Sequence, residues 1–120
     1  TGGIETVEYL CGKNGVVKGL ATDIPVDDKS YHVVSMLDVI EHLLPEDTIP
    51  ALEELGRVAI DYILVTANNR TSKSLGVELH INIRDYQEWD NIFRSVYPDA
   101  EVTWLPKMYN NISETWLIKL

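Results

Sequence analysis

Polar and titratable side chains follow three apolar runs of this sequence. Two more such side chains lie in a later polar loop. They are Thr22 and Asp23, then Asp38, Glu41 and His42, then Asn68, Asn69 and Arg70, and finally His80 and Asn82. An unperturbed imidazole has a pKa of about 6.5, so His42 or His80 could serve as a general base near neutral pH. Carboxylates accept hydrogen bonds from amino groups, so the acidic residues could orient a polar small molecule.

These residues can act together only if the fold brings them to one place, and the apolar pattern predicts an α/β sheet. Runs rich in β-branched residues indicate strands. We expect them at Val16–Ala21, Tyr31–Leu37, Tyr62–Thr66, Glu101–Leu105 and Thr115–Leu120, with Asn110 and Asn111 in the last turn. The second strand is apolar on both faces, as a buried parallel strand would be.

Two amphipathic helices are predicted between these strands. The first is indicated by apolar residues at helical spacing, namely Ile49, Leu52, Leu55 and Val58. Asp47 or Thr48 can cap its start. In the second helix, Asp85 and Glu88 have capping-box spacing. Its apolar stripe consists of Tyr86, Trp89, Phe93 and Val96. Both helices should pack on the sheet and leave the strand ends free for a ligand.

In open parallel sheets, ligands bind beyond the carboxyl ends of the strands. This rule predicts that Asp23, Asp38 and His42 lie along a single rim. If these three side chains lay at opposite ends of the molecule, they could not share one site.

Four stretches in a fixed order resemble the class I S-adenosylmethionine-dependent methyltransferases. They are Ala21–Val34, Leu37–Leu43 with its Glu-His-Leu ending, Ile63–Asn68, and Leu79–Asn82 followed by Trp89. The resemblance runs from about Val16 to the end. It implies an α/β, Rossmann-like methyltransferase fold that is incomplete, with a mostly parallel sheet and an antiparallel C-terminal edge. We expect a single domain over residues 1–120, truncated at its N-terminus.

The resemblance also implies roles for individual residues, with S-adenosylmethionine as the cofactor. Cofactor binding would fall to Thr22, Asp23, Ile24, Leu37 and Asp38, with Asp23 near the adenine amino group. His42 and His80 would be the catalytic candidates, and Asn68 and Asn82 would contact the acceptor. Methyl transfer from a sulfonium needs alignment more than an enzyme nucleophile. No metal ligands are assigned.

Each of these residues also has a structural interpretation. Asp23 can simply form a turn before Pro25. Glu41 and His42 can be solvated residues at a helix entrance, and His80 and Asn82 can stabilise a loop. Trp89 and Trp104 have the spacing of core aromatics.

The chain departs from the family at its start. Family members have a glycine-rich turn and a ribose-binding acid, but neither Gly2-Gly3 nor Cys11–Gly15 fits that turn. We therefore expect the first strand, helix and second strand of the fold to be missing. A second hypothesis follows, in which the domain has lost cofactor binding and serves as an interaction or regulatory module that can form a homodimer. The lack of a G-x-G-x-x-G motif argues against a dehydrogenase fragment.

Composition limits the remaining choices. A chain of 120 residues with 45% hydrophobic residues can form one core. Its net charge of -9 argues against a nucleic-acid partner. No apolar run approaches the ~20 residues of a membrane helix. The single cysteine, Cys11, favours a reducing, cytoplasmic setting.

Two points stay open at the level of sequence. The sequence does not specify whether the methyl acceptor is a small molecule or a protein. Residues 1–15 could form a helix or, with Asn14-Gly15, a hairpin.

Overall fold

The computed structural model describes residues 16–70, 73–106 and 113–120. The expectations for residues 1–15, including Cys11 and Gly2-Gly3, and for the turn at Asn110 and Asn111 lie outside these ranges. None of the described helices is long and apolar enough to cross a membrane.

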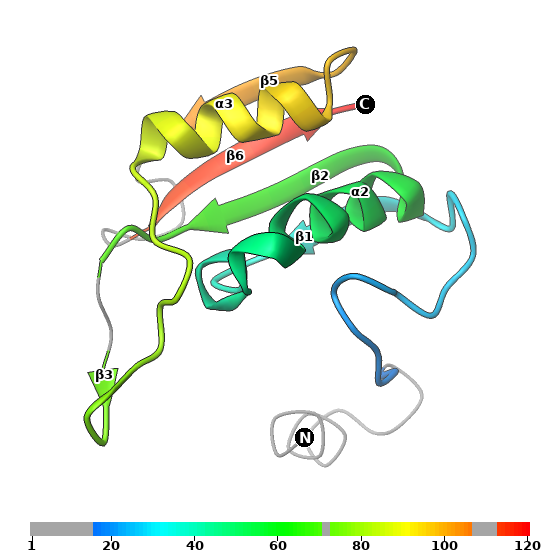
Figure 1. The fold of residues 1–120 in the computed structure, drawn as a ribbon. Coiled ribbons are helices and arrows are strands. Elements are labelled where there is room, and N and C mark those ends of the chain that lie inside the picture. The colour runs from blue at the N-terminus through cyan, green and yellow to red at the C-terminus, as the bar shows by residue number, and fades with distance from the viewer. Residues whose placement is uncertain (1–15, 71–72, 107–112) are drawn as a thin grey trace.

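Four strands form the main sheet in the order β1-β2-β6-β5 (Figure 1). Their bounds are Tyr31–Met36 for β1, Ala59–Ala67 for β2, Glu101–Leu105 for β5 and Glu114–Lys119 for β6. β1 is parallel to β2, whereas β6 is antiparallel to both β2 and β5. Three strands therefore run in one direction, and the reversed β6 lies between β2 and β5. This arrangement confirms the predicted α/β fold with its antiparallel C-terminal pair.

Both long helices cover the same face of this sheet (Figure 1). They are α2 at Thr48–Val58 and α3 at Tyr86–Val96. One apolar cluster joins them to the sheet; it includes Leu52, Leu55, Ile63, Val65, Trp89, Phe93, Trp116 and Ile118. The predicted stripes are confirmed except at Ile49, which is 42% exposed. Asp85 caps α3 as predicted, since its carboxylate accepts from the backbone N–H of Glu88 at 2.8 Å.

The predicted burial of both faces of β1 is wrong. Val33 is 58% exposed and Ile60 of the adjacent β2 is 37% exposed. Both lie on the side of the sheet away from α2 and α3, and β1 is the edge strand of the described sheet. Residues of β1 on the helix side, such as Met36, are buried.

Short elements connect the layers. Two 3-10 turns, η2 at Ile40–His42 and η3 at Pro45–Asp47, lead from β1 to α2. A small hairpin of β3 (Lys73–Ser74) and β4 (Val77–Glu78) follows β2. Leu75 and Gly76 form its turn with φ angles of 51° and 79°. The sequence pattern did not predict this hairpin, whose strands have only two residues each.

The predicted strand at Val16–Ala21 is also wrong. Only an isolated bridge between Leu20 and Asp23 forms there. The backbone that follows is held by α2 instead. The N–H of Ile24 donates to Glu54 at 2.8 Å, and the Arg57 guanidinium donates to the carbonyl groups of Ile24 and Val26. These side-chain partners replace the strand partners that the pattern implied.

Candidate functional site at the carboxyl ends of β1 and β2

The parallel strands β1 and β2 end at the same edge of the sheet, and polar residues follow both. Asp38, just after β1, has a positive φ of 56°. This conformation is uncommon for a non-glycine residue, and Asp tolerates it better than most. The backbone N–H of Asp38 donates to Thr66 Oγ1 of β2 at 2.8 Å, and its carboxylate accepts from Ser113 Oγ at 3.1 Å. Asp38 thus ties the ends of β1 and β2 to the start of β6.

The turn η2 places two adjacent side chains at this rim, one buried and one exposed. Glu41 is only 1% exposed, and its Oε2 has no hydrogen-bond partner. Burial raises the pKa of Glu41, while the neighbouring His42 and His80 act in the opposite direction. His42 is exposed, and its Nδ1 lies 3.0 Å from the carbonyl oxygen of Leu79. The interpretation of Glu41 as a solvated residue is therefore wrong.

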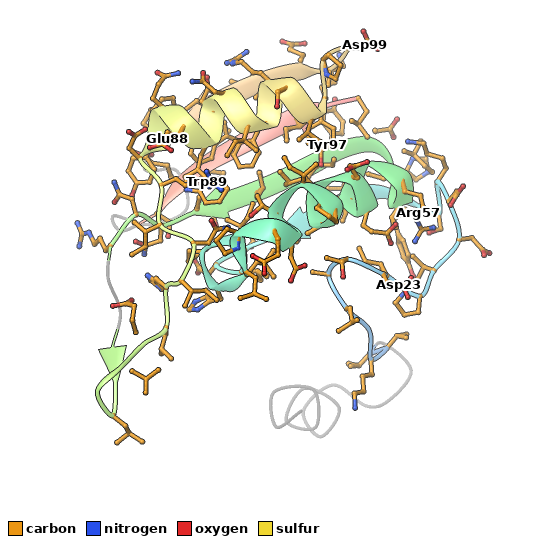
Figure 2. All side chains as sticks on the ribbon, in the orientation of Figure 1. Asp23, Arg57, Glu88, Trp89, Tyr97 and Asp99 are labelled. Atoms are coloured by element: carbon orange, nitrogen blue, oxygen red, sulfur yellow. The ribbon has the colours of Figure 1, made fainter. Side chains whose placement is uncertain are left out.

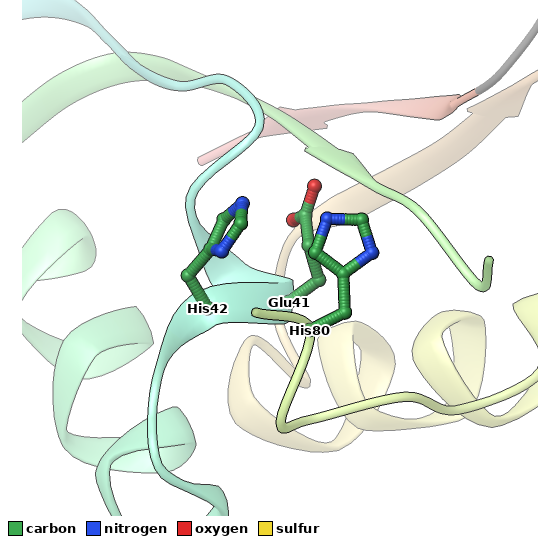
Figure 3. A group of neighbouring side chains, drawn as sticks. All are labelled: Glu41, His42 and His80. Atoms are coloured by element: carbon green, nitrogen blue, oxygen red, sulfur yellow. The ribbon is translucent and has the colours of Figure 1, made fainter. Parts of the chain in front are cut away.

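His80 reaches the same place from the loop after β4. It is 9% exposed, and its Nδ1 is hydrogen-bonded to the carbonyl oxygen of Arg70. Its ring meets that of His42 edge to face, with the centroids 4.6 Å apart and the planes at 77°. Figure 3 shows Glu41, His42 and His80 converging from two segments. The sequence pattern indicated both histidines and placed Glu41 next to His42, but it gave Glu41 no catalytic or binding role.

The side-chain amide of Asn82 fastens this loop to η2 and α2. Asn82 is 2% exposed, and its Nδ2 donates to the Ile40 carbonyl at 3.2 Å and to Thr48 Oγ1 at 2.7 Å. Its backbone N–H donates to the Glu41 carbonyl at 3.2 Å. The structure therefore supports the loop-stabilising interpretation of Asn82, because its amide hydrogens already have partners within the chain.

Asn68 follows β2 and also makes a local contact. Its Oδ1 accepts from the backbone N–H of Arg70 at 2.8 Å, which shapes the first turn of the loop. The side chain is 8% exposed. Asn68 is thus on the rim as expected, while its predicted contact with an acceptor stays a prediction.

Thr22, Asp23 and Ile24 are not part of this rim. Figure 2 places Asp23 beside Arg57, at the end of α2 that is remote from the carboxyl ends of β1 and β2. The Ile24 contacts to Glu54 and Arg57 fix this position. The single rim predicted for Asp23, Asp38 and His42 is therefore only partly formed, because the segment holding Asp23 packs on a helix rather than entering the sheet.

A surface pocket of about 220 Å³ lies at the opposite end of the sheet. Its lining consists of Tyr97, Pro98, Asp99, Ala100 and Leu120. Figure 2 shows Tyr97 and Asp99 at the end of α3 remote from the rim. With Asp99 as its one ionisable carboxylate and no histidine, this lining offers less chemistry than the rim does.

No family model matches this sequence, and no curated protein matches it. Solved structures do. A possible histamine N-methyltransferase from Thermotoga maritima, described as S-adenosylmethionine-dependent, is 20% identical, with 96% of this chain and 69% of that chain covered and a TM-score of 0.66. PigF, solved with SAH, is 14% identical over 99% and 40% of the two chains, with a TM-score of 0.65.

A chain of the Pnkp1/Rnl/Hen1 RNA repair complex is 19% identical, with 80% and 24% of the two chains covered and a TM-score of 0.61. This chain therefore spans between about a quarter and about two thirds of the length of these three structures. At such identities the likeness concerns the fold. The chain has the Rossmann-like fold of S-adenosylmethionine-dependent methyltransferases, in incomplete form.

Proposed function

We propose that this chain takes part in S-adenosylmethionine-dependent methyl transfer to a small-molecule or protein acceptor. The observation that carries the proposal is the α/β fold with the sheet order β1-β2-β6-β5, which is similar, at a TM-score of 0.66, to a structure described as an S-adenosylmethionine-dependent methyltransferase. In such sheets the ligand lies beyond the carboxyl ends of the parallel strands. Asp38, Glu41, His42 and His80 occupy that position here.

Leu37 and Asp38 are the residues that we propose for the cofactor. They follow β1 directly, and the positive φ of Asp38 turns the chain at the point where the cofactor's methionine side would lie. Thr22, Asp23 and Ile24 have no part in the proposal, because they lie beside α2. Adenine recognition would have to come from other residues.

His42 and His80 are proposed for the acceptor side. A carbonyl oxygen can only accept a hydrogen bond, so the contacts to Leu79 and Arg70 place a proton on Nδ1 of each ring. Each neutral imidazole then has its lone pair on Nε2. These lone pairs could accept an acceptor's proton during methyl transfer or bind a cation.

Calorimetric titration with S-adenosylhomocysteine, the demethylated product, tests cofactor binding directly. We expect saturable binding that Asp38→Ala weakens by at least about tenfold, through loss of a polar contact and of the rim conformation. Asp99→Ala, at the opposite end of the sheet, is the matched control and should bind like the parent. Circular dichroism establishes that each variant is folded.

If the folded parent chain shows no saturable binding, methyl transfer by this chain is refuted and the second candidate is favoured. In that candidate the domain is an interaction module that pairs with a second copy of itself. The exposed β-branched and aromatic residues of β1, Tyr31 at 55% and Val33 at 58%, are the observation that favours it.

A further inference from the structure

Three side chains of the kinds that ligate transition metals meet at the rim. Glu41 and His42 come from η2, and His80 comes from the loop after β4 (Figure 3). One ligand atom from each lies within 4.8 Å of the other two, and no other such group occurs among the described residues. Ligands that share one Zn²⁺ at ~2.1 Å lie roughly 3–4 Å apart, so small side-chain rotations would close the set.

Both imidazoles are already oriented as metal ligands. In metal sites, the ring nitrogen that does not bind the ion commonly donates to a backbone carbonyl, which fixes the tautomer. Nδ1 of His42 has such a partner in Leu79, and Nδ1 of His80 has one in Arg70. Nε2 of each ring therefore has a free lone pair.

Glu41 supplies a second, independent observation. Its side chain is 99% buried, and Oε2 has no hydrogen-bond partner. No lysine or arginine forms an ion pair with it among the described residues. A buried carboxylate oxygen without a partner is costly, and buried carboxylates normally pair with a cation or coordinate a metal. Beside two imidazole lone pairs, a bound cation would satisfy this oxygen.

The cluster is braced on one side and open on the other. Asn82 ties the loop of His80 to η2 through the carbonyl groups of Ile40 and Glu41. Such bracing holds ligands near a binding geometry before the ion arrives. His42 is exposed, which gives an ion a path from solvent.

We propose that Glu41, His42 and His80 bind a divalent transition-metal ion through one carboxylate oxygen and two imidazole Nε2 atoms. Two histidines and a carboxylate form the ligand set of zinc and non-haem iron sites that keep open coordination positions. Mg²⁺ and Ca²⁺ prefer oxygen ligands alone, so this site should select against them. Metal binding at this site does not depend on methyl transfer. In this proposal His42 and His80 are metal ligands and not general bases.

Titration of the EDTA-treated full chain with Co²⁺ and Zn²⁺ tests the proposal. We expect one ion per chain, visible d–d absorption from Co²⁺, displacement of Co²⁺ by Zn²⁺, and no competition from a large excess of Mg²⁺. Glu41→Gln and His80→Asn should each weaken Co²⁺ binding by at least about tenfold, since even the loss of an outer-shell partner costs ~10–100-fold. S-adenosylhomocysteine titrations on the same EDTA-treated protein measure cofactor binding without the metal. A failure of metal binding can therefore be told apart from a failure of cofactor binding.

The control variant is His32→Asn. His32 is the third histidine, lies on β1, and is paired with Asp61 at 2.8 Å with its side chain 77% exposed. The His32→Asn variant should leave Co²⁺ binding unchanged. Cys11→Ala, which removes the single thiol, should also leave it unchanged.

Nitrogen-15 spectra of the histidine rings make the test independent of whether a variant folds. In the parent chain, Zn²⁺ should shift Nε2 of His42 and His80 and leave His32 unchanged. The proposal is overturned if the folded parent binds no Co²⁺ or Zn²⁺, if Mg²⁺ competes equally, or if the shifts occur at His32 instead.

Discussion

At the scale of single residues, Asn82 shows how one buried amide can hold the segments of a site together. Its two amide hydrogens have partners in different segments, the carbonyl of Ile40 in η2 and the hydroxyl of Thr48 in α2. Its Oδ1 accepts from Arg84. Removing the amide would take the donor from buried Thr48 Oγ1 and one of the two donors from the Ile40 carbonyl, and it would free the loop that holds His80.

Asn82→Ala is therefore expected to lower the free energy of unfolding by about 2 kcal/mol, because an unpaired buried polar group costs ~1–3 kcal/mol. It should also weaken Co²⁺ binding by several-fold, since His80 is less well positioned. Urea unfolding and the cobalt titration measure the two effects. Asn91→Ala on the exposed face of α3 is the control, with a change within about 0.5 kcal/mol. Equal stability of the two variants would contradict the role given to Asn82.

The site could be predicted from sequence only in part, and the reason is visible in individual residues. His42 and His80 were identified by residue type and by their place after strands. Glu41 follows the same strand as His42, but a solvated position at a helix entrance was an equally open interpretation, because such positions are usually exposed. The burial of Glu41 depends on tertiary contacts made by the loop around Asn82. Ile40 and Asn82 are 42 positions apart, so the local sequence carries no signal of that contact.

At the scale of elements, α2 anchors the segment that precedes β1. Arg57 donates to two backbone carbonyl groups in that segment and contacts the Asp28 carboxylate at 2.7 Å. Glu54 accepts from Arg57 and from the N–H of Ile24. These two hydrogen-bonded partners, Arg57 first, lower the pKa of Glu54 from 4.5 to about 2.

A lowered folded-state pKa means that ionised Glu54 stabilises the fold above about pH 4.5 and that this contribution is lost as the pH falls toward 2. The urea midpoint of the parent chain should thus exceed that of Glu54→Gln at neutral pH. The difference should shrink between pH 4.5 and 2. Glu53→Gln, exposed on the same helix, should show no such convergence. A gap between the parent chain and Glu54→Gln that stayed constant with pH would rule out the anchoring role of Glu54.

Elements with a strong local signal were predicted well, and those fixed by long-range partners were not. The capping-box spacing of Asp85 and Glu88 located the start of α3, and Glu101–Leu105 was found with its correct bounds. By contrast, Val16–Ala21 has the composition of a strand, yet it lacks a neighbouring strand in the described sheet. Strand propensity measures fit to a partner surface, and without that surface the residues adopt another path.

At the scale of the whole molecule, the described helices α2 and α3 cover one face of the sheet, and the two central strands have partners on both sides. β2 lies between β1 and β6, and β6 lies between β2 and β5. Within the described residues, β1 pairs on one side only. The central pair also contributes the fully buried side chains Ile63, Val65, Trp116 and Ile118. Local stability should therefore be highest in the centre and should fall toward β1.

Hydrogen exchange followed by NMR tests this gradient. Amides of β2 and β6 that lie in the sheet ladder should exchange at least about tenfold more slowly than those of β1, because opening an edge strand leaves the core intact. If β1 amides exchanged as slowly as those of β2, a backbone partner would have to cover the outer edge of β1. That partner could be a second copy of the chain or another segment of the same chain, and a dilution series separates the two. Protection of the β1 amides that falls on dilution indicates a second copy, whereas constant protection indicates pairing within the chain. An edge that is fully open should show fast exchange at every concentration, and in that case the homodimer of the second candidate function would be excluded.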